Sequence, residues 1–98
     1  MPTKIAFCAS YGRFVLSEKC KRRMEYLGYT GPYDSWRIKR HDPILIQAIE
    51  EIGLQQASGE CCELAIAVIS GHRYKIDEYD GWETVIEPKD IQWISTVD

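Results

Sequence analysis

Apolar and polar positions along the chain follow two periodicities, which divide it into a helical first half and a strand-rich second half. A short apolar run at residues 4–10, KIAFCAS, ends at Tyr11-Gly12 and predicts a buried strand followed by a turn. Two segments with helical spacing come next, and three segments rich in β-formers follow them. The predicted order is therefore β-α-α-β-β-β. This order is typical of an α+β domain in which two helices cover one face of a mainly antiparallel sheet.

Both predicted helices carry recognisable start and stop signals. The first begins after Ser17, a preferred N-cap residue, and ends at Gly28. The second begins with Asp42 as N-cap and Pro43 at its first position, and ends at Gly53. Apolar stripes predict the buried faces, made by Leu16, Cys20, Met24 and Leu27 in the first helix and by Leu45, Ala48, Ile49 and Ile52 in the second.

The second half of the chain predicts a three-strand meander. Its strands are ELAIAVIS at 63–70, HRYKIDEY at 72–79 and WETVIEP at 82–88, and Asp80-Gly81 predicts a tight hairpin turn between the last two. The segment IQWIS at 91–95 is either a last strand or a packed tail, and Trp93 is assigned to core packing. Alternation predicts an inner face with Leu64, Ile66 and Val68 opposite Tyr74 and Ile76, and an outer face with Lys75, Asp77 and Glu83.

Composition points to one small domain spanning residues 1–98, since 98 residues with 45% hydrophobic content suffice for a single core. The sequence has neither a run of about eighteen apolar residues nor a signal-peptide layout, so we expect no membrane contact and a location in the host cytoplasm. The four cysteines lack CxxC or zinc-ligand spacing. We therefore expect no disulfide framework, no metal and no cofactor.

Charge is divided unevenly along the chain. Residues 1–49 carry nine Lys/Arg against four Asp/Glu, whereas residues 50–98 carry three against eleven. This division favours an anionic ligand at a basic surface or head-to-tail self-association, and neutralisation within the fold is an equally good interpretation. We expect a homo-oligomer. The pI of about 5.4 argues against binding of long nucleic acid.

Several motifs of the chain resemble those of a known family. The segments are RHDPILIQAIEEIG at 40–53, ELAIAVISGHRYKIDEYDGWETV at 63–85, the opening YGRFVLS at 11–17 and the closing WI. In these, the chain is similar to a widespread family of small uncharacterised bacteriophage and prophage proteins with an RHDP helix start and an EYDG hairpin. The AIAV strand and the QQASGECC link depart from the family pattern. The resemblance implies a small phage-encoded accessory protein of the kind that counters host defences, and it names no target.

Catalytic motifs are absent from the sequence, although single candidate residues occur. Asp77, Glu78 and Asp80 lie close together in the hairpin, and His41 or His72 are candidate bases. No nucleophile elbow, Walker loop or HExxH motif accompanies them. The acids are better interpreted as keeping an exposed hairpin soluble and protecting a strand edge, with Asp80 supplying turn geometry.

The better-supported hypothesis is binding of a small anion. A helix N-terminus attracts anions, and the start of the second helix follows four cationic or titratable residues, although Asp42 itself caps that terminus. A second predicted anion site lies at Gly12 and Arg13, and nearby aromatic rings are suited to stacking on a base. The candidate ligand-binding residues are Tyr11, Arg13, Tyr33, Trp36, Arg37, Lys39, Arg40 and His41.

Together these observations favour a non-enzymatic phage accessory protein that sequesters a small nucleotide-derived immune signal. The alternatives are an inhibitor that binds a host defence protein directly, such as an anti-CRISPR, and an enzyme that degrades a nucleotide signal. A flat sheet with Tyr79, Trp82 and Trp93 near an edge would suit an inhibitor that binds a host protein, because aromatic residues are favoured interface anchors.

Overall fold

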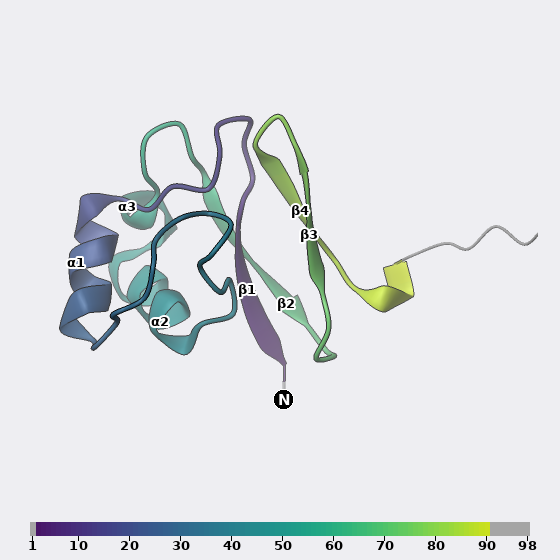
Figure 1. The fold of residues 1–98 in the computed structure, drawn as a ribbon, viewed down its shortest axis with the longest axis horizontal. Helices are drawn as coiled ribbons and strands as arrows, with labels where there is room; N and C mark the ends of the chain where they lie inside the picture. Colours follow the sequence, from purple (N-terminus) through teal and green to yellow (C-terminus); the bar gives the residue numbers. More distant parts are fainter. Residues whose placement is uncertain (1, 91–98) are drawn as a thin grey trace, which may run out of the picture.

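The structure is a computed structural model that describes residues 2–90, and it confirms the α+β class (Figure 1). The segment IQWIS, with Trp93, lies outside the described residues, so the predictions for it stay predictions. In chain order the elements are β1 (Thr3–Cys8), α1 (Glu18–Tyr26), α2 (Pro43–Ile52), α3 (Leu54–Ala57), β2 (Leu64–Ile69), β3 (Lys75–Tyr79), β4 (Trp82–Ile86) and the short 3-10 turn η1 (Pro88–Asp90).

Both predicted helices begin at the residues expected from the sequence. The Ser17 hydroxyl accepts a hydrogen bond from the Cys20 amide at 3.1 Å, and a carboxylate oxygen of Asp42 accepts one from the Ile44 amide at 2.8 Å. Each helix ends at or just before a glycine with positive φ, Gly28 at 101° and Gly53 at 90°. The caps satisfy backbone groups that have no partner within the helix.

The strands pair differently from the predicted meander. Antiparallel β1 and β2 pair from Thr3 opposite Ile69 to Cys8 opposite Leu64, and β3 and β4 form a separate antiparallel hairpin. The prediction that β2 pairs with β3 was therefore wrong, because β2 uses the distant β1 as its partner. The inner face predicted for β2 is also only partly right, since Leu64 is buried but Val68 is 61% exposed.

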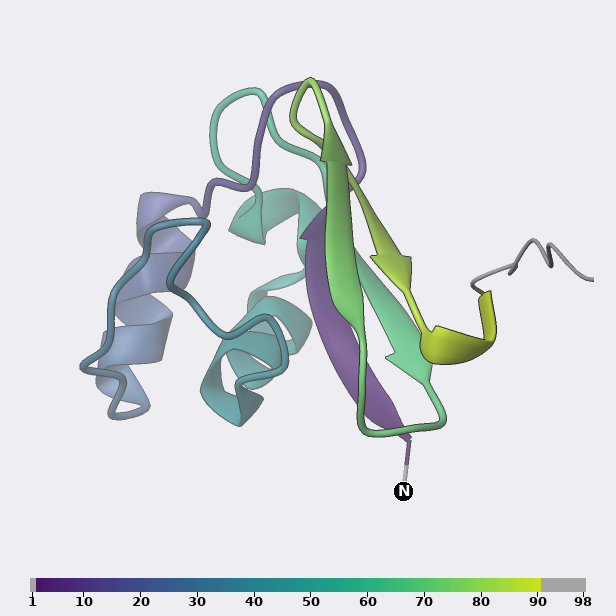
Figure 2. The same ribbon diagram turned by 45° about the vertical axis from the view of Figure 1, so that its right-hand side comes forward.

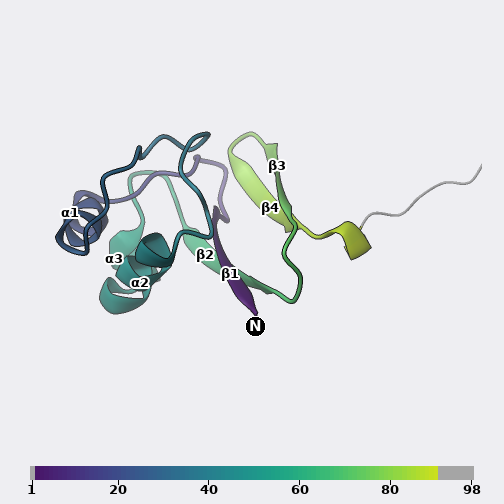
Figure 3. The same ribbon diagram turned by 60° about the horizontal axis from the view of Figure 1, so that its bottom comes forward.

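The elements form three layers. Figures 1 and 3 show the helices on one side of the β1–β2 pair and the β3–β4 hairpin on its other side. Turning the molecule brings the hairpin to the front (Figure 2), and β4 is the hairpin strand that packs closer to β1. In this arrangement β1 is the central strand of the molecule.

The main core lies between the helices and β1–β2. It contains Cys20 and Met24 of α1 together with Leu45 and Ile49 of α2, all fully buried. These residues belong to the predicted helical stripes. Successive side chains of β1 point to opposite faces, yet Ile5 and Ala6 are both fully buried, so both faces of this strand are covered. None of the described helices is long and apolar enough to cross a membrane.

Candidate functional site

Within residues 2–90, the edge of β1 that faces away from β2 is bound by side chains and a loop instead of a strand. The Ala6 amide donates to the Arg40 carbonyl at 2.9 Å, and the Cys8 amide donates to Glu83 Oε1 at 2.8 Å. Arg40 Nη1 lies 3.5 Å from the Ala6 carbonyl, at the limit of a hydrogen bond. Residues from the loop before α2 and from β4 thus satisfy the polar groups of an edge that would otherwise be buried without partners.

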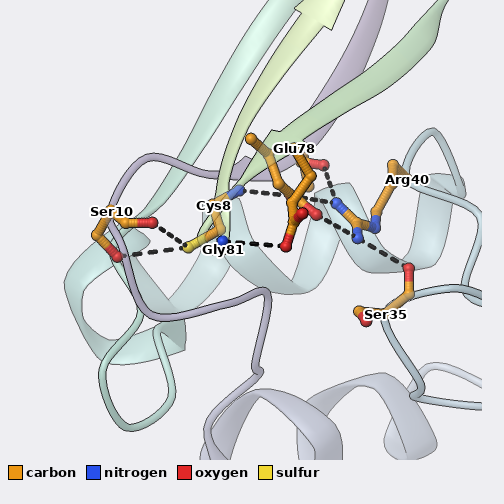
Figure 4. A network of polar contacts seen from close by, with 8 residues as sticks. Cys8, Ser10, Ser35, Arg40, Glu78 and Gly81 are labelled. Atoms are coloured by element: carbon orange, nitrogen blue, oxygen red, sulfur yellow. Dashed lines mark hydrogen bonds and ion pairs between the residues drawn. The ribbon is translucent and has the colours of Figure 1, made fainter.

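Arg40 and Glu83 form a buried, two-pronged ion pair, and Figure 4 shows the Arg40 guanidinium that makes it. Arg40 Nη1 donates to Glu83 Oε1 at 2.5 Å and Nη2 donates to Oε2 at 2.8 Å, and only 6% and 7% of the two side chains are exposed. Nη2 also donates to the Ser35 carbonyl at 2.8 Å, and the guanidinium lies 3.7 Å from the centre of the Phe14 ring. This planar, bidentate geometry is the one in which arginine pairs most strongly with a carboxylate.

The predicted outward position of Glu83 was wrong, and the hairpin register gives the reason. A two-residue turn at Asp80-Gly81 pairs Tyr79 with Trp82, which places Glu78 opposite Glu83 and Ile76 opposite Val85. Cross-strand partners share a face, so Glu83 lies on the same side of the hairpin as the half-buried Ile76 and Val85. The burial is tolerated because Arg40 neutralises the carboxylate there.

A cleft of about 430 Å³ opens beside this ion pair. It is the space between the loop before α2, the segment before α1 and the hairpin. Trp36 on its wall is 80% exposed. The structure gathers five of the predicted ligand-binding residues around this basic cleft: Arg13, Trp36, Lys39, Arg40 and His41.

The charges around the basic cleft are not all used within the fold. Arg40 is paired with Glu83, whereas Arg13 and Lys39 form no ion pair with any residue that the structure describes. Glu78 also lines the cleft, and its Oε1 accepts a hydrogen bond from the Gly81 amide at 3.0 Å. The cleft lining therefore holds two cations and one carboxylate that have no ion pair among the described residues.

His41 is held against a residue that the sequence did not single out for the site. Its Nδ1 lies 2.7 Å from the hydroxyl of Tyr74, and the two rings meet edge to face with centroids 5.7 Å apart. Burial raises the pKa of Tyr74, an effect partly opposed by the nearby positive charge of Arg40. The hydroxyl therefore stays neutral at physiological pH and fixes the orientation of the imidazole.

The three remaining predicted residues lie elsewhere. Arg37 pairs with Asp34, with Nε 2.8 Å from Oδ2, so its charge is used by a neighbour in the same loop. Tyr33 is half-buried, with its ring centroid 5.3 Å from that of Tyr29, and lines an adjoining hollow of about 220 Å³. Tyr11, in the loop after β1, lies beside the tip of the hairpin, and the centroid of its ring is 5.0 Å from that of Trp82.

Among the hairpin acids, Asp80 has the structural use predicted for it. Asp80 has a φ of 50° and Gly81 a φ of 89°, as a tight two-residue hairpin turn requires, which confirms the predicted role of Asp80. Within residues 2–90, no group of three or more His, Cys, Asp or Glu side chains is placed to hold a metal ion.

Sequence reasoning missed Tyr74, Glu78 and Glu83 as parts of the cleft wall. The register imposed by the Asp80-Gly81 turn could have placed Glu78 and Glu83 on one face of the hairpin. No comparable signal connects Tyr74 with His41, because the two residues are 33 positions apart and meet only in the folded chain. Comparison of the chain with protein-family models, curated proteins and solved structures finds no match.

Proposed function

We propose that this protein is a phage-encoded accessory protein that counters host defence by binding a small, anionic, nucleotide-like ligand in the basic cleft and sequestering it unchanged. The phage context comes from the family resemblance of the sequence. The single observation that carries the binding proposal is the meeting of Arg13, Lys39, His41 and the exposed Trp36 around one cleft.

The cleft suits such a ligand in size and chemistry. Its volume of about 430 Å³ lies within the usual range of small-molecule pockets, roughly 300–1,000 Å³. Unpaired Arg13 and Lys39 supply charged donors for phosphate oxygens, and the Trp36 ring supplies a face on which a base can stack. The Arg40–Glu83 pair beneath contributes rigidity, because it fixes the loop that carries Lys39 and His41.

Calorimetry and native mass spectrometry against cyclic dinucleotides and ADP-ribose-type nucleotides test the proposal. We expect one ligand of this panel to bind at micromolar protein and to be recovered unchanged after the complex is heated. Absence of binding across the panel would overturn sequestration of this ligand class. Recovery of a converted product would instead assign an enzyme that degrades the signal.

Charge reversal locates the ligand. We expect Lys39→Glu and Arg13→Glu each to weaken binding about tenfold or more, because a hydrogen bond to a charged group contributes about 1.5–3 kcal/mol. Lys19→Glu makes the same change on the exposed surface of α1, away from the cleft, and should leave affinity unchanged. Equal losses in all three variants would indicate a general charge effect and contradict a ligand in this cleft.

A further inference from the structure

A second pocket lies on the outward face of the hairpin. The β3–β4 register places Tyr79 beside Trp82 and Asp77 beside Thr84, and cross-strand partners share a face. These four side chains therefore project away from the face that carries the buried Glu83. They line a hollow of about 400 Å³ together with Tyr11 and Glu78.

The loop after β1 brings Tyr11 to this hollow, and two glycines permit the approach. A Cβ at Gly81 would lie 1.8 Å from the Gly12 carbonyl oxygen, and a Cβ at Gly12 would lie 1.4 Å from the Cys61 carbonyl oxygen. Figures 1 and 2 both show this loop beside the hairpin tip. The contact holds the Tyr11 ring 5.0 Å from the Trp82 ring, at an interplanar angle of 62°.

The rings remain largely open to solvent. Tyr79 is 74% exposed, Tyr11 66% and Trp82 41%. A cluster of exposed aromatic side chains on a small domain commonly marks an interaction surface. We call the surface formed by Tyr11, Asp77, Glu78, Tyr79 and Trp82 the aromatic–acidic pocket.

The charge of the aromatic–acidic pocket is opposite to that of the basic cleft. Asp77 and Glu78 are exposed, and neither forms an ion pair with a residue in the described part of the chain. No Lys, Arg or His is among the described residues that line the pocket. Electron-rich ring faces beside unpaired carboxylates attract an organic cation and repel an anion.

We infer that the aromatic–acidic pocket binds an arginine side chain presented by a basic segment of a partner protein. A guanidinium is planar, so it can stack on Tyr79 or Trp82 while it donates paired hydrogen bonds to the Asp77 carboxylate on the same face. A lysine ammonium offers no plane for stacking and is more strongly hydrated. The shape and charge of the pocket thus favour arginine over lysine, and a basic partner over an acidic one.

This inference concerns a different surface from the basic cleft and does not rest on the proposed function. Glu78 lies at the border of both, so it is left unchanged in the tests. The nucleotide experiments and the peptide experiments below can therefore fail independently of each other.

NMR of the ¹⁵N-labelled full chain tests the inference with a capped Gly-Arg-Gly-Arg-Gly peptide. We expect the indole N–H signal of Trp82 and the amides of Asp77 and Tyr79 to shift on titration, with the shifts reduced at high salt. The matched peptide with citrulline in place of arginine keeps the planar group but loses the charge, and should not bind. The lysine peptide should bind more weakly than the arginine peptide.

Variants connect binding to the pocket. We expect Tyr79→Ala and Asp77→Asn each to weaken peptide binding about two- to fivefold, the usual effect of an exposed cation–π contact or surface ion pair. Both positions are exposed, so the variants should fold, and the dispersion of their amide spectra checks this. Tyr26→Ala removes an exposed ring of α1 that lines neither pocket, and should leave the affinity for the peptide unchanged. Equal shifts with the citrulline peptide, or unchanged affinity in folded Tyr79→Ala, would overturn the inference.

Discussion

Arg40 is the residue on which the arrangement of the molecule depends most directly. Its backbone carbonyl and side chain bind the free edge of β1, and its guanidinium joins the loop before α2 to β4 through Glu83. From the sequence alone it was one cation among several in RIKRHDP. The structure separates these cations by burial, since Arg40 is 5% exposed whereas Arg37 and Lys39 are exposed.

Loss of either partner of the buried pair should destabilise the fold strongly. We expect Arg40→Met or Glu83→Gln to lower the free energy of unfolding by about 3–5 kcal/mol, because each leaves a buried group without its partner. The double variant Arg40→Met/Glu83→Leu should lose less than either single variant, although the Cys8 amide then lacks an acceptor. Denaturant unfolding of the two single variants and of the double variant measures these free energies.

Arg37→Met is the matched control, since its ion pair with Asp34 is exposed. It should change stability by no more than about 0.5 kcal/mol. A loss in Arg40→Met as small as that in Arg37→Met would contradict the structural role of the buried pair.

The individual cysteines are expected to differ in reactivity, because they differ in burial. Burial raises the pKa of Cys20 to about 11 and is the main cause that raises the pKa of Cys62 to about 12, whereas Cys61 is exposed. We expect one fast-reacting thiol with Ellman's reagent at pH 8, lost in Cys61→Ser, and the others to react only after unfolding. Rapid modification of all the thiols in the native protein would contradict this burial pattern.

The same pKa shifts predict an alkaline loss of stability. The folded state holds these thiols protonated, so their contribution is complete below the ordinary thiol pKa of about 9. Above that pH the unfolded chain releases protons more readily, and stability falls as pH rises toward about 11–12. Urea unfolding at pH 8 and pH 10 should show a lower midpoint at pH 10, and a smaller decrease in Cys20→Ala if the thiol is responsible.

At the scale of elements, the sequence predicted the helices and the hairpin, which depend on local signals, but it did not predict the pairing between distant strands. Capping residues and apolar stripes placed α1 and α2, and the Asp-Gly turn placed the β3–β4 hairpin, because these depend on neighbours in the sequence. The pairing of β1 with β2 joins segments more than fifty residues apart, and no local pattern encodes it. The aromatic–acidic pocket also escaped prediction as a unit, since Tyr11 reaches it from another segment.

Gly81 in the hairpin turn is required for two reasons: its φ is positive, and its neighbours leave no space for a Cβ atom. Gly81→Ala should destabilise the protein more than Gly28→Ala, although both glycines have positive φ, 89° and 101°. A Cβ at Gly28 meets no atom within 4 Å, so that variant bears only the conformational cost of about 1–2 kcal/mol. At Gly81 the new Cβ must also displace the Gly12 carbonyl. Thermal unfolding compares the two, and equal losses would show that the loop yields freely.

At the scale of the whole molecule, the two charged halves are partly neutralised within the fold. Lys4–Glu50, Arg23–Glu51 and Arg40–Glu83 each join a cation of the first half to a carboxylate of the second half. Internal neutralisation, one of the two interpretations of the sequence, therefore accounts for part of the charge division. The cations at the basic cleft and the acids at the aromatic–acidic pocket that have no ion pair among the described residues are part of the remainder, together with exposed charges elsewhere, such as Lys19 and Arg22.

The charges of the basic cleft and of the aromatic–acidic pocket, whose described linings share Glu78, are opposite in sign and complement each other between copies of the chain. We therefore expect head-to-tail self-association that strengthens at low salt, since exposed charges interact over about 10 Å at 0.1 M ionic strength and over about 3 Å at 1 M. Sedimentation velocity at 20 mM and 500 mM NaCl should show a larger weight-average mass at low salt. Reversing the exposed Lys39 of the basic cleft to Glu removes cationic charge from one of the two complementary surfaces, and should reduce the difference between the two salt conditions. A mass that is independent of salt and of protein concentration would contradict electrostatic self-association, and would leave the remaining charges to ligands and partners of other kinds.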